Sequence, residues 1–376
     1  MKALDGLGLA VVAALTVTGI VLMSPGRAEA RTPDVRYTLD PVTRKDYAGF
    51  GEEGFAALEQ ALTAFFGPHA QPTLPDGAAE ALGLSPERIQ HGRNLYVEKC
   101  MHCHGMSGGG DGPTAPFLVP RPRSFRMGKI KFASTPRTSP PVHEDLLRVL
   151  QRGVAYTAMP SFVNESREDL EALASYAQFL LMRGSTERLV AFVLDDEGTL
   201  EEELTPEQRQ QAILEYMAEE FDGVRQSWVD ARDQVIEAPT PRPQASEESV
   251  ARGKALFLDA TTECSACHGE DGKGQGPNVY SAEPFPDEIT GELRTGYKKY
   301  DEWGTELKAA ERGYEARPAD LTRGFYRGGD RPIDLYRRIH QGVNGNIMPA
   351  FGGNLTPEQI WDLVNYIYSI RFLGVR

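Results

Sequence analysis

The arrangement of the four cysteines constrains this chain more than any other feature of its sequence. The chain has 376 residues, and its cysteines form two close pairs. A histidine follows each pair at once, so that the two motifs are Cys100-Met101-His102-Cys103-His104 and Cys264-Ser265-Ala266-Cys267-His268. An even number of cysteines is compatible with disulfides. Two complete Cys-x-x-Cys-His motifs, however, use every cysteine in the chain.

Cys-x-x-Cys-His is the attachment signature of c-type haem. Two thiols add to the two vinyl groups along one edge of a porphyrin, and the adjacent histidine gives an imidazole nitrogen to the iron. A thioredoxin-like dithiol would need a βαβ setting. A structural zinc site could use two Cys-x-x-Cys pairs, but the histidines would then be coincidental. We therefore predict two covalently attached haems c, held by Cys100, Cys103 and His104 and by Cys264, Cys267 and His268.

The segments around both motifs resemble the class I cytochrome c family. The resemblance covers about residues 85–185 and 246–376. In both segments a glycine, followed four residues later by an aromatic residue, precedes the motif, with Gly92 in the first and Gly253 in the second. The resemblance implies an all-α fold, in which two class I cytochrome c domains are joined by a long helical connector. It also implies that each glycine lets the first helix of its domain cross the closing helix closely.

A second repeat lies after the motifs and suggests the other iron ligands. Asp145-Leu146-x-Arg148…Gly153-Val154…Met159-Pro160-x-Phe162 recurs 189 residues later, ending in Met348-Pro349-x-Phe351. A methionine alone is usually core packing, but this repetition and the family resemblance favour Met159 and Met348 as sixth ligands. Met106 and Met127 have no counterpart in the second segment. None of the other histidines recurs at an equivalent position, although His143 and His340 remain possible ligands.

The resemblance assigns roles to two more repeated pairs. A Gly-Pro step ends nine residues after each motif histidine, at Pro113 and Pro277. In the family such a proline carbonyl accepts the imidazole N–H, whereas without the family Gly-Pro is only a turn. Arg121 and Arg317 each begin a repeated Arg-Pro sequence. Their guanidinium groups suit haem propionates, and an exposed loop arginine is the equal alternative.

The remaining segments complete the domain organisation. In residues 1–30, Lys2 precedes an uncharged apolar run and Ala28-Glu29-Ala30 follows it, which is typical of a signal peptide or a membrane anchor. Residues 31–84 form an N-terminal extension. Residues 186–245 contain an amphipathic helix from 206 to about 236 and a Pro-rich linker. That helix either braces a haem domain or binds a partner. Residues 282–316 are an insertion in the second domain.

Charge and ligation together indicate the class of function. The formal charge of −14 argues against nucleic acid as a partner. Iron with histidine and methionine ligands has no open position for a substrate. We therefore predict an exported, periplasmic electron-transfer protein, soluble or membrane-anchored, that is not itself an enzyme. It would act between a redox donor and acceptor, as a carrier or as a subunit of a respiratory oxidoreductase complex. A diheme peroxidase or thiosulfate-oxidising enzyme, which needs one open haem, is the alternative.

Overall fold

The computed structural model describes seven ranges of the chain, namely 37–118, 120–198, 204–277, 285–286, 293–294, 318–344 and 348–372. The chain divides into two units, Met1–Val35 and Arg36–Arg376. The predicted signal peptide or anchor at 1–30 lies outside the described residues. Within the described ranges, no helix is both long and apolar enough to cross a membrane.

The first haem domain is built on two helices that cross closely. Its helices are α4 (Pro86–Lys99), α5 (Met101–His104), α6 (His143–Arg152) and α7 (Arg167–Asp196). Ser85 begins α4 because its side chain accepts the N–H of Arg88. A Cβ atom at Gly92 would overlap the carbonyl oxygen of Ala172 on α7. Only a residue without a side chain allows α4 and α7 to pack at this distance.

The second haem domain repeats this plan. Its helices are α9 (Glu247–Leu258), α10 (Cys264–His268), α11 (Pro332–Gln341) and α12 (Pro357–Ser369). A Cβ atom at Gly253 would overlap the carbonyl oxygen of Asp362 on α12. The predicted capping box of Thr356 is present, since its N–H donates to Gln359 Oε1 at 2.8 Å. The all-α prediction is confirmed. The only sheet among the described residues is the antiparallel pair β1 (Phe285–Pro286) and β2 (Leu293–Arg294), which falls in the insertion.

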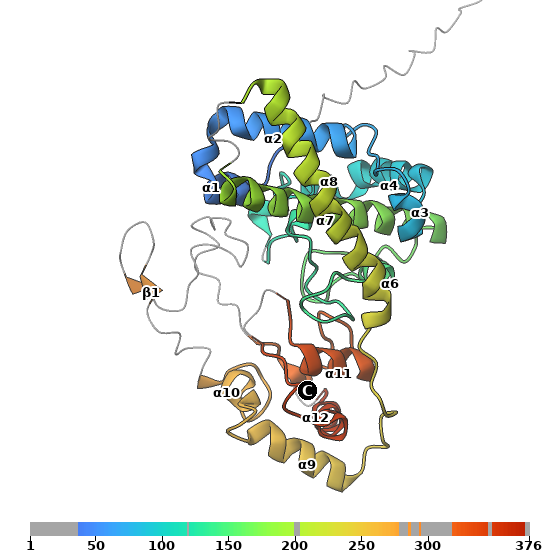
Figure 1. Cartoon of the computed structure of the whole chain (residues 1–376). Coiled ribbons are helices and arrows are strands. Elements are labelled where there is room, and N and C mark those ends of the chain that lie inside the picture. Colours follow the sequence, from blue (N-terminus) through green and yellow to red (C-terminus); the bar gives the residue numbers. More distant parts are fainter. Residues whose placement is uncertain are drawn as a thin grey trace, which may run out of the picture. The chain divides into compact units, whose positions relative to one another are not determined.

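The extension and the connector pack together on the first domain. The extension forms α1 (Pro41–Asp46), α2 (Gly51–Phe66) and α3 (Ala78–Leu82), and the connector forms α8 (Pro206–Asp230). Helix α8 packs against α2, α3 and α7 (Figure 1). Its buried face is the predicted apolar stripe of Ile213, Met217, Phe221, Val224 and Trp228. This packing fits a brace better than a partner-binding helix. Helix α7 also continues past residue 185, so the closing helix and the start of the connector are one element.

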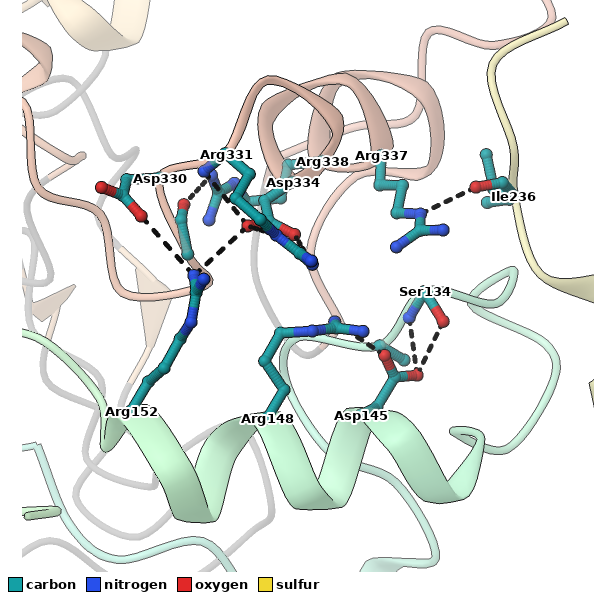
Figure 2. Close-up of polar contacts among 12 residues, drawn as sticks. Ser134, Asp145, Arg148, Arg152, Ile236, Asp330, Arg331, Asp334, Arg337 and Arg338 are labelled. Carbon is teal, nitrogen blue, oxygen red and sulfur yellow. Dashed lines mark hydrogen bonds and ion pairs between the residues drawn. The ribbon is translucent and has the colours of Figure 1, made fainter. Parts of the chain in front are cut away.

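The two haem domains meet through α6 and the region around α11, which are equivalent parts of the repeat. Arg152 on α6 approaches carboxylate oxygens of Asp330 at 3.5 Å and Asp334 at 3.7 Å (Figure 2). In the other direction, Gln341 Nε2 on α11 donates to the carbonyl oxygen of Ala133 at 2.6 Å. Gln341 lies 189 residues after Arg152 and so occupies the same place in the repeat. Each domain therefore uses the same position to reach the other, as in a two-fold interface.

Replacing Gly92 or Gly253 by alanine tests the close helix crossings. The new methyl group would collide with backbone rather than with a flexible side chain. The free energy of unfolding of each variant should therefore be about 1–3 kcal/mol lower than that of the wild type. Thermal unfolding of the haem-loaded chain measures the effect. Gly223→Ala on α8 is the matched control, because a Cβ there meets nothing within 4 Å and alanine favours a helix. Equal stability of Gly92→Ala and Gly223→Ala would contradict the close crossing.

Candidate haem-binding sites

Each motif histidine is oriented by a backbone carbonyl. His104 Nδ1 lies 2.9 Å from the carbonyl oxygen of Arg123, and His268 Nδ1 lies 3.0 Å from that of Ala319. A carbonyl oxygen can only accept, so Nδ1 carries the proton in both rings. The lone pair of Nε2 is then left for a metal. This arrangement fits both residues as axial ligands of haem iron, since ligating imidazoles donate their other N–H in the same way.

The acceptors that we predicted were wrong: the carbonyls of Pro113 and Pro277 do not receive the imidazole N–H. Both prolines lie exposed. The glycine before each proline instead passes directly beneath the motif helix, and a Cβ at Gly112 would lie 2.5 Å from the carbonyl oxygen of His102. The glycine of the Gly-Pro step therefore lets the chain pass close to the backbone of the motif helix.

The true acceptors belong to the repeated Arg-Pro sequence. Arg123 and Ala319 stand two residues after Arg121 and Arg317, respectively. The repeated Arg-Pro sequence is the feature that could have pointed to these acceptors, but our prediction gave a role only to its two arginines. Arg121 lies in the described loop, whereas Arg317 lies outside the described residues, so their pairing with propionates stays a prediction.

The same hydrogen bonds hold the loop after each motif. Gly110 N–H donates to the His104 carbonyl at 2.8 Å, and Gly274 N–H donates to the His268 carbonyl at 2.7 Å. Further along, the backbone of Phe125 and that of Leu321 are tied to the loop by equivalent bonds of 2.7 Å. The side chains differ, because the Phe125 ring stacks on His104 with centroids 4.7 Å apart. These backbone hydrogen bonds are therefore common to the two sites, whereas the side chains beside the histidines differ.

Burial sets the protonation of the site residues. It lowers the pKa of His104 to about 4 and also lowers the pKa of His268. Both imidazoles are thus neutral near pH 7, which is the form that binds a metal. Burial also raises the pKa of the Cys100 thiol to about 12. None of the four cysteines, all of which the structure describes, forms a disulfide.

The zinc interpretation finds no support in the geometry. No group of three or more His, Cys, Asp or Glu side chains that could hold a metal ion occurs in the described ranges. The first Cys-x-x-Cys pair lies on α5 and the residue before it, in the first domain. The second pair lies on α10, in the second domain. Each pair therefore serves its own site.

The two methionine loops have equivalent backbone hydrogen bonds at their described ends. Val154 N–H donates to the Met159 carbonyl at 3.1 Å, and Val343 N–H donates to the Met348 carbonyl at 3.4 Å. Gly153 and Gly342 begin the loops with a positive φ, of 65° and 75°, which favours glycine. The Met159 and Met348 side chains are partly buried, and each packs against the core of its own domain.

Several other histidines are held by protein partners. His69 Nε2 lies 3.1 Å from the Met106 carbonyl oxygen. The ring nitrogen is the donor, because a carbonyl oxygen only accepts. His91 Nε2 lies 2.7 Å from Asp169, and His143 Nε2 lies 2.7 Å from Glu171. His340 stacks on Tyr336 with ring centroids 6.0 Å apart. These contacts give His69, His91 and His143 structural roles.

Two protein-family comparisons agree with the two predicted cytochrome segments. Residues 250–371 match the family described as cytochrome c, and residues 87–176 match the family described as cytochrome c oxidase, cbb3-type, subunit III. The comparison with curated proteins gave no match. Among solved structures, the chain is similar to a reducing HAO-like protein complex of Kuenenia stuttgartiensis. The identity is 25%, the match covers 75% of this chain and 96% of that chain, and the TM-score is 0.49.

The chain is a tandem c-type cytochrome, with two class I cytochrome c domains in one polypeptide. Such domains carry covalently attached haem c, and two domains imply two haems. Cytochrome c domains transfer electrons, which requires redox partners, and they typically work outside the cytoplasm.

Removing the cysteines of one motif should remove one haem. We expect two haems per chain in the wild type and one in the double variant Cys264→Ala/Cys267→Ala, because that porphyrin loses both covalent links while the first domain keeps its own. Intact mass under denaturing conditions and the pyridine haemochrome spectrum count the haems. The reciprocal variant Cys100→Ala/Cys103→Ala is the matched control. Two covalent haems in either double variant would contradict the assignment.

Proposed function

We propose that this cytochrome transfers electrons between a redox donor and an acceptor outside the cytoplasmic membrane. His104 and Met159 would be the axial ligands in the first domain, and His268 and Met348 those in the second. In this proposal the protein is an electron-transfer component and not an enzyme.

The methionine loops carry this proposal. They follow α6 and α11 at the same distance, begin with a glycine of positive φ and close with the same Val-to-Met backbone hydrogen bond. A further bond fixes the loop ends, from Phe162 N–H to the Leu150 carbonyl at 2.8 Å and from Phe351 N–H to the Ile339 carbonyl at 3.0 Å. Two independent packing methionines have no reason to share this frame.

Closed histidine–methionine coordination suits electron transfer and opposes substrate chemistry. Methionine ligation raises the reduction potential of haem iron, as the late part of a respiratory chain requires. With two sites in contacting domains, an electron can enter at one haem and leave at the other. A peroxidase would need one site with a displaceable ligand, whereas the described ends of both methionine loops are held by the same backbone hydrogen bonds.

One observation favours a place in a respiratory oxidoreductase complex over a free carrier, and two others support export and docking on a redox partner. Residues 87–176 match a family described as a subunit of cbb3-type oxidase. In addition, residues 1–30 combine an apolar run with a cleavage-like Ala-x-Ala sequence, which supports export with or without retention as an anchor. The net charge of −14 suits docking on a basic redox partner.

The visible spectrum tests the ligands directly. The oxidised protein should show the weak methionine–iron charge-transfer band in the far red, with the intensity of two haems. Met159→Ala and Met348→Ala should each remove about half of the band, because each opens one site. Met217→Leu on the buried face of α8 is the control and should leave the band intact. If one haem of the wild type lacked the band and bound carbon monoxide readily, the enzyme alternative would replace this proposal.

A further inference from the structure

Tyr156 stands in the methionine loop of the first site with an unfavourable backbone. Its φ is +58°, in the left-handed region that side chains with a Cβ rarely adopt. The strain belongs to a tight turn, in which Thr157 N–H donates to the Val154 carbonyl at 3.2 Å. The Thr157 hydroxyl also accepts the N–H of Met159 at 3.1 Å. Tyr156 is thus at the centre of the turn that fixes the backbone of the proposed ligand.

The equivalent position of the sequence repeat has a different residue. Position 345, which is 189 residues after Tyr156, is a glycine. Glycine adopts a positive φ without steric cost, whereas a tyrosine there costs on the order of 1 kcal/mol or more. A strained residue that replaces the expected glycine points to a role for its side chain.

The Tyr156 ring reaches a cation of the other domain. The guanidinium carbon of Arg323 lies 5.3 Å from the ring centroid, within the range of a cation–π contact. Tyr156 is half exposed, so the ring is not simply filling the core of its own domain. Arg323 is held in place by Asp320, whose Oδ2 accepts from its Nε at 3.2 Å.

Arg323 belongs to the loop that orients the histidine of the second site. It ends the short 3-10 helix Leu321–Arg323, which begins two residues after Ala319, the acceptor of the His268 N–H. The two loops also share a cavity of about 150 Å³, which Gly153 and Ala155 line from the first domain and Phe325 lines from the second. The methionine loop of one site therefore lies beside the histidine-orienting loop of the other.

We infer that Tyr156 and Arg323 are positioning residues through which the second domain holds the methionine loop of the first site closed. The inference rests on the proposed role of Met159 as a ligand. It explains the strained tyrosine, because its side chain at this point of the turn contacts Arg323. It also makes the stability of one coordination sphere depend on a residue of the other domain.

The test is displacement of the first methionine by imidazole in the haem-loaded, full-length chain. In a Met348→Ala background, the remaining far-red band belongs to the first haem alone, and its loss on titration with imidazole gives an apparent affinity. Arg323→Gln and Tyr156→Leu should each raise this affinity about two- to five-fold, the range expected for loss of an exposed cation–π contact. Tyr156→Phe should behave like the wild type, because phenylalanine keeps the ring.

Two further variants separate positioning from general effects. Arg327→Gln removes the same charge from the same loop, at a residue that lines the cavity without lying over Tyr156, and should leave the affinity unchanged. Tyr156→Gly should raise the thermal stability, because it relieves the strain, and yet should make Met159 easier to displace. Equal shifts in Arg323→Gln and Arg327→Gln, or no shift in Tyr156→Leu, would overturn the inference. Absence of a first-haem band before titration would instead reject Met159 as a ligand.

Discussion

The crossing of the first and last helices of each domain is the constraint on which both haem sites depend. Helix α4 leads directly into Cys100, Cys103 and His104, so the position of α4 sets the position of the motif. Gly92 lets α4 pack on α7 at backbone distance. Gly253 does the same for α9 and α12. Once the crossing is fixed, the short motif helix, the glycine-rich loop and the returning Arg-Pro segment have little freedom. The carbonyl that orients each imidazole follows from that path.

The family resemblance and the repeat together predicted most of the haem-domain fold, and the reasons are local. Helix starts such as Ser85 and Thr356 have side chains that cap a helix within three residues, so the sequence is enough to find them. The apolar stripe of α8 likewise requires a buried face at a period of 3.6 residues. The crossing glycines were found because a glycine, followed four residues later by an aromatic residue, precedes each motif.

The errors concern interactions between segments that are distant along the chain. Pro113 and Pro277 were given the imidazole N–H, but the path of the loop places Arg123 and Ala319 opposite the rings. No pattern within one loop determines which carbonyl faces a ring. The contact of Arg152 with Asp330 and Asp334 could not be predicted from the sequence either, because it depends on how the two domains meet. The strain at Tyr156 needed backbone angles, although the repeat offered its glycine counterpart as a clue.

The two domains differ in the groups that surround their motif histidines, and such groups affect the reduction potential of a haem. In the first domain the Tyr96 hydroxyl donates to the Gly105 carbonyl at 2.7 Å beside the motif histidine, whereas Phe257 takes its place in the second and can donate nothing. Arg126 is buried near Thr38 of the extension, and Thr322 occupies the equivalent position in the second domain. Hydrogen bonding, charge and burial around a haem set its potential. Two haems held by equivalent backbone hydrogen bonds in unlike surroundings would therefore differ in reduction potential.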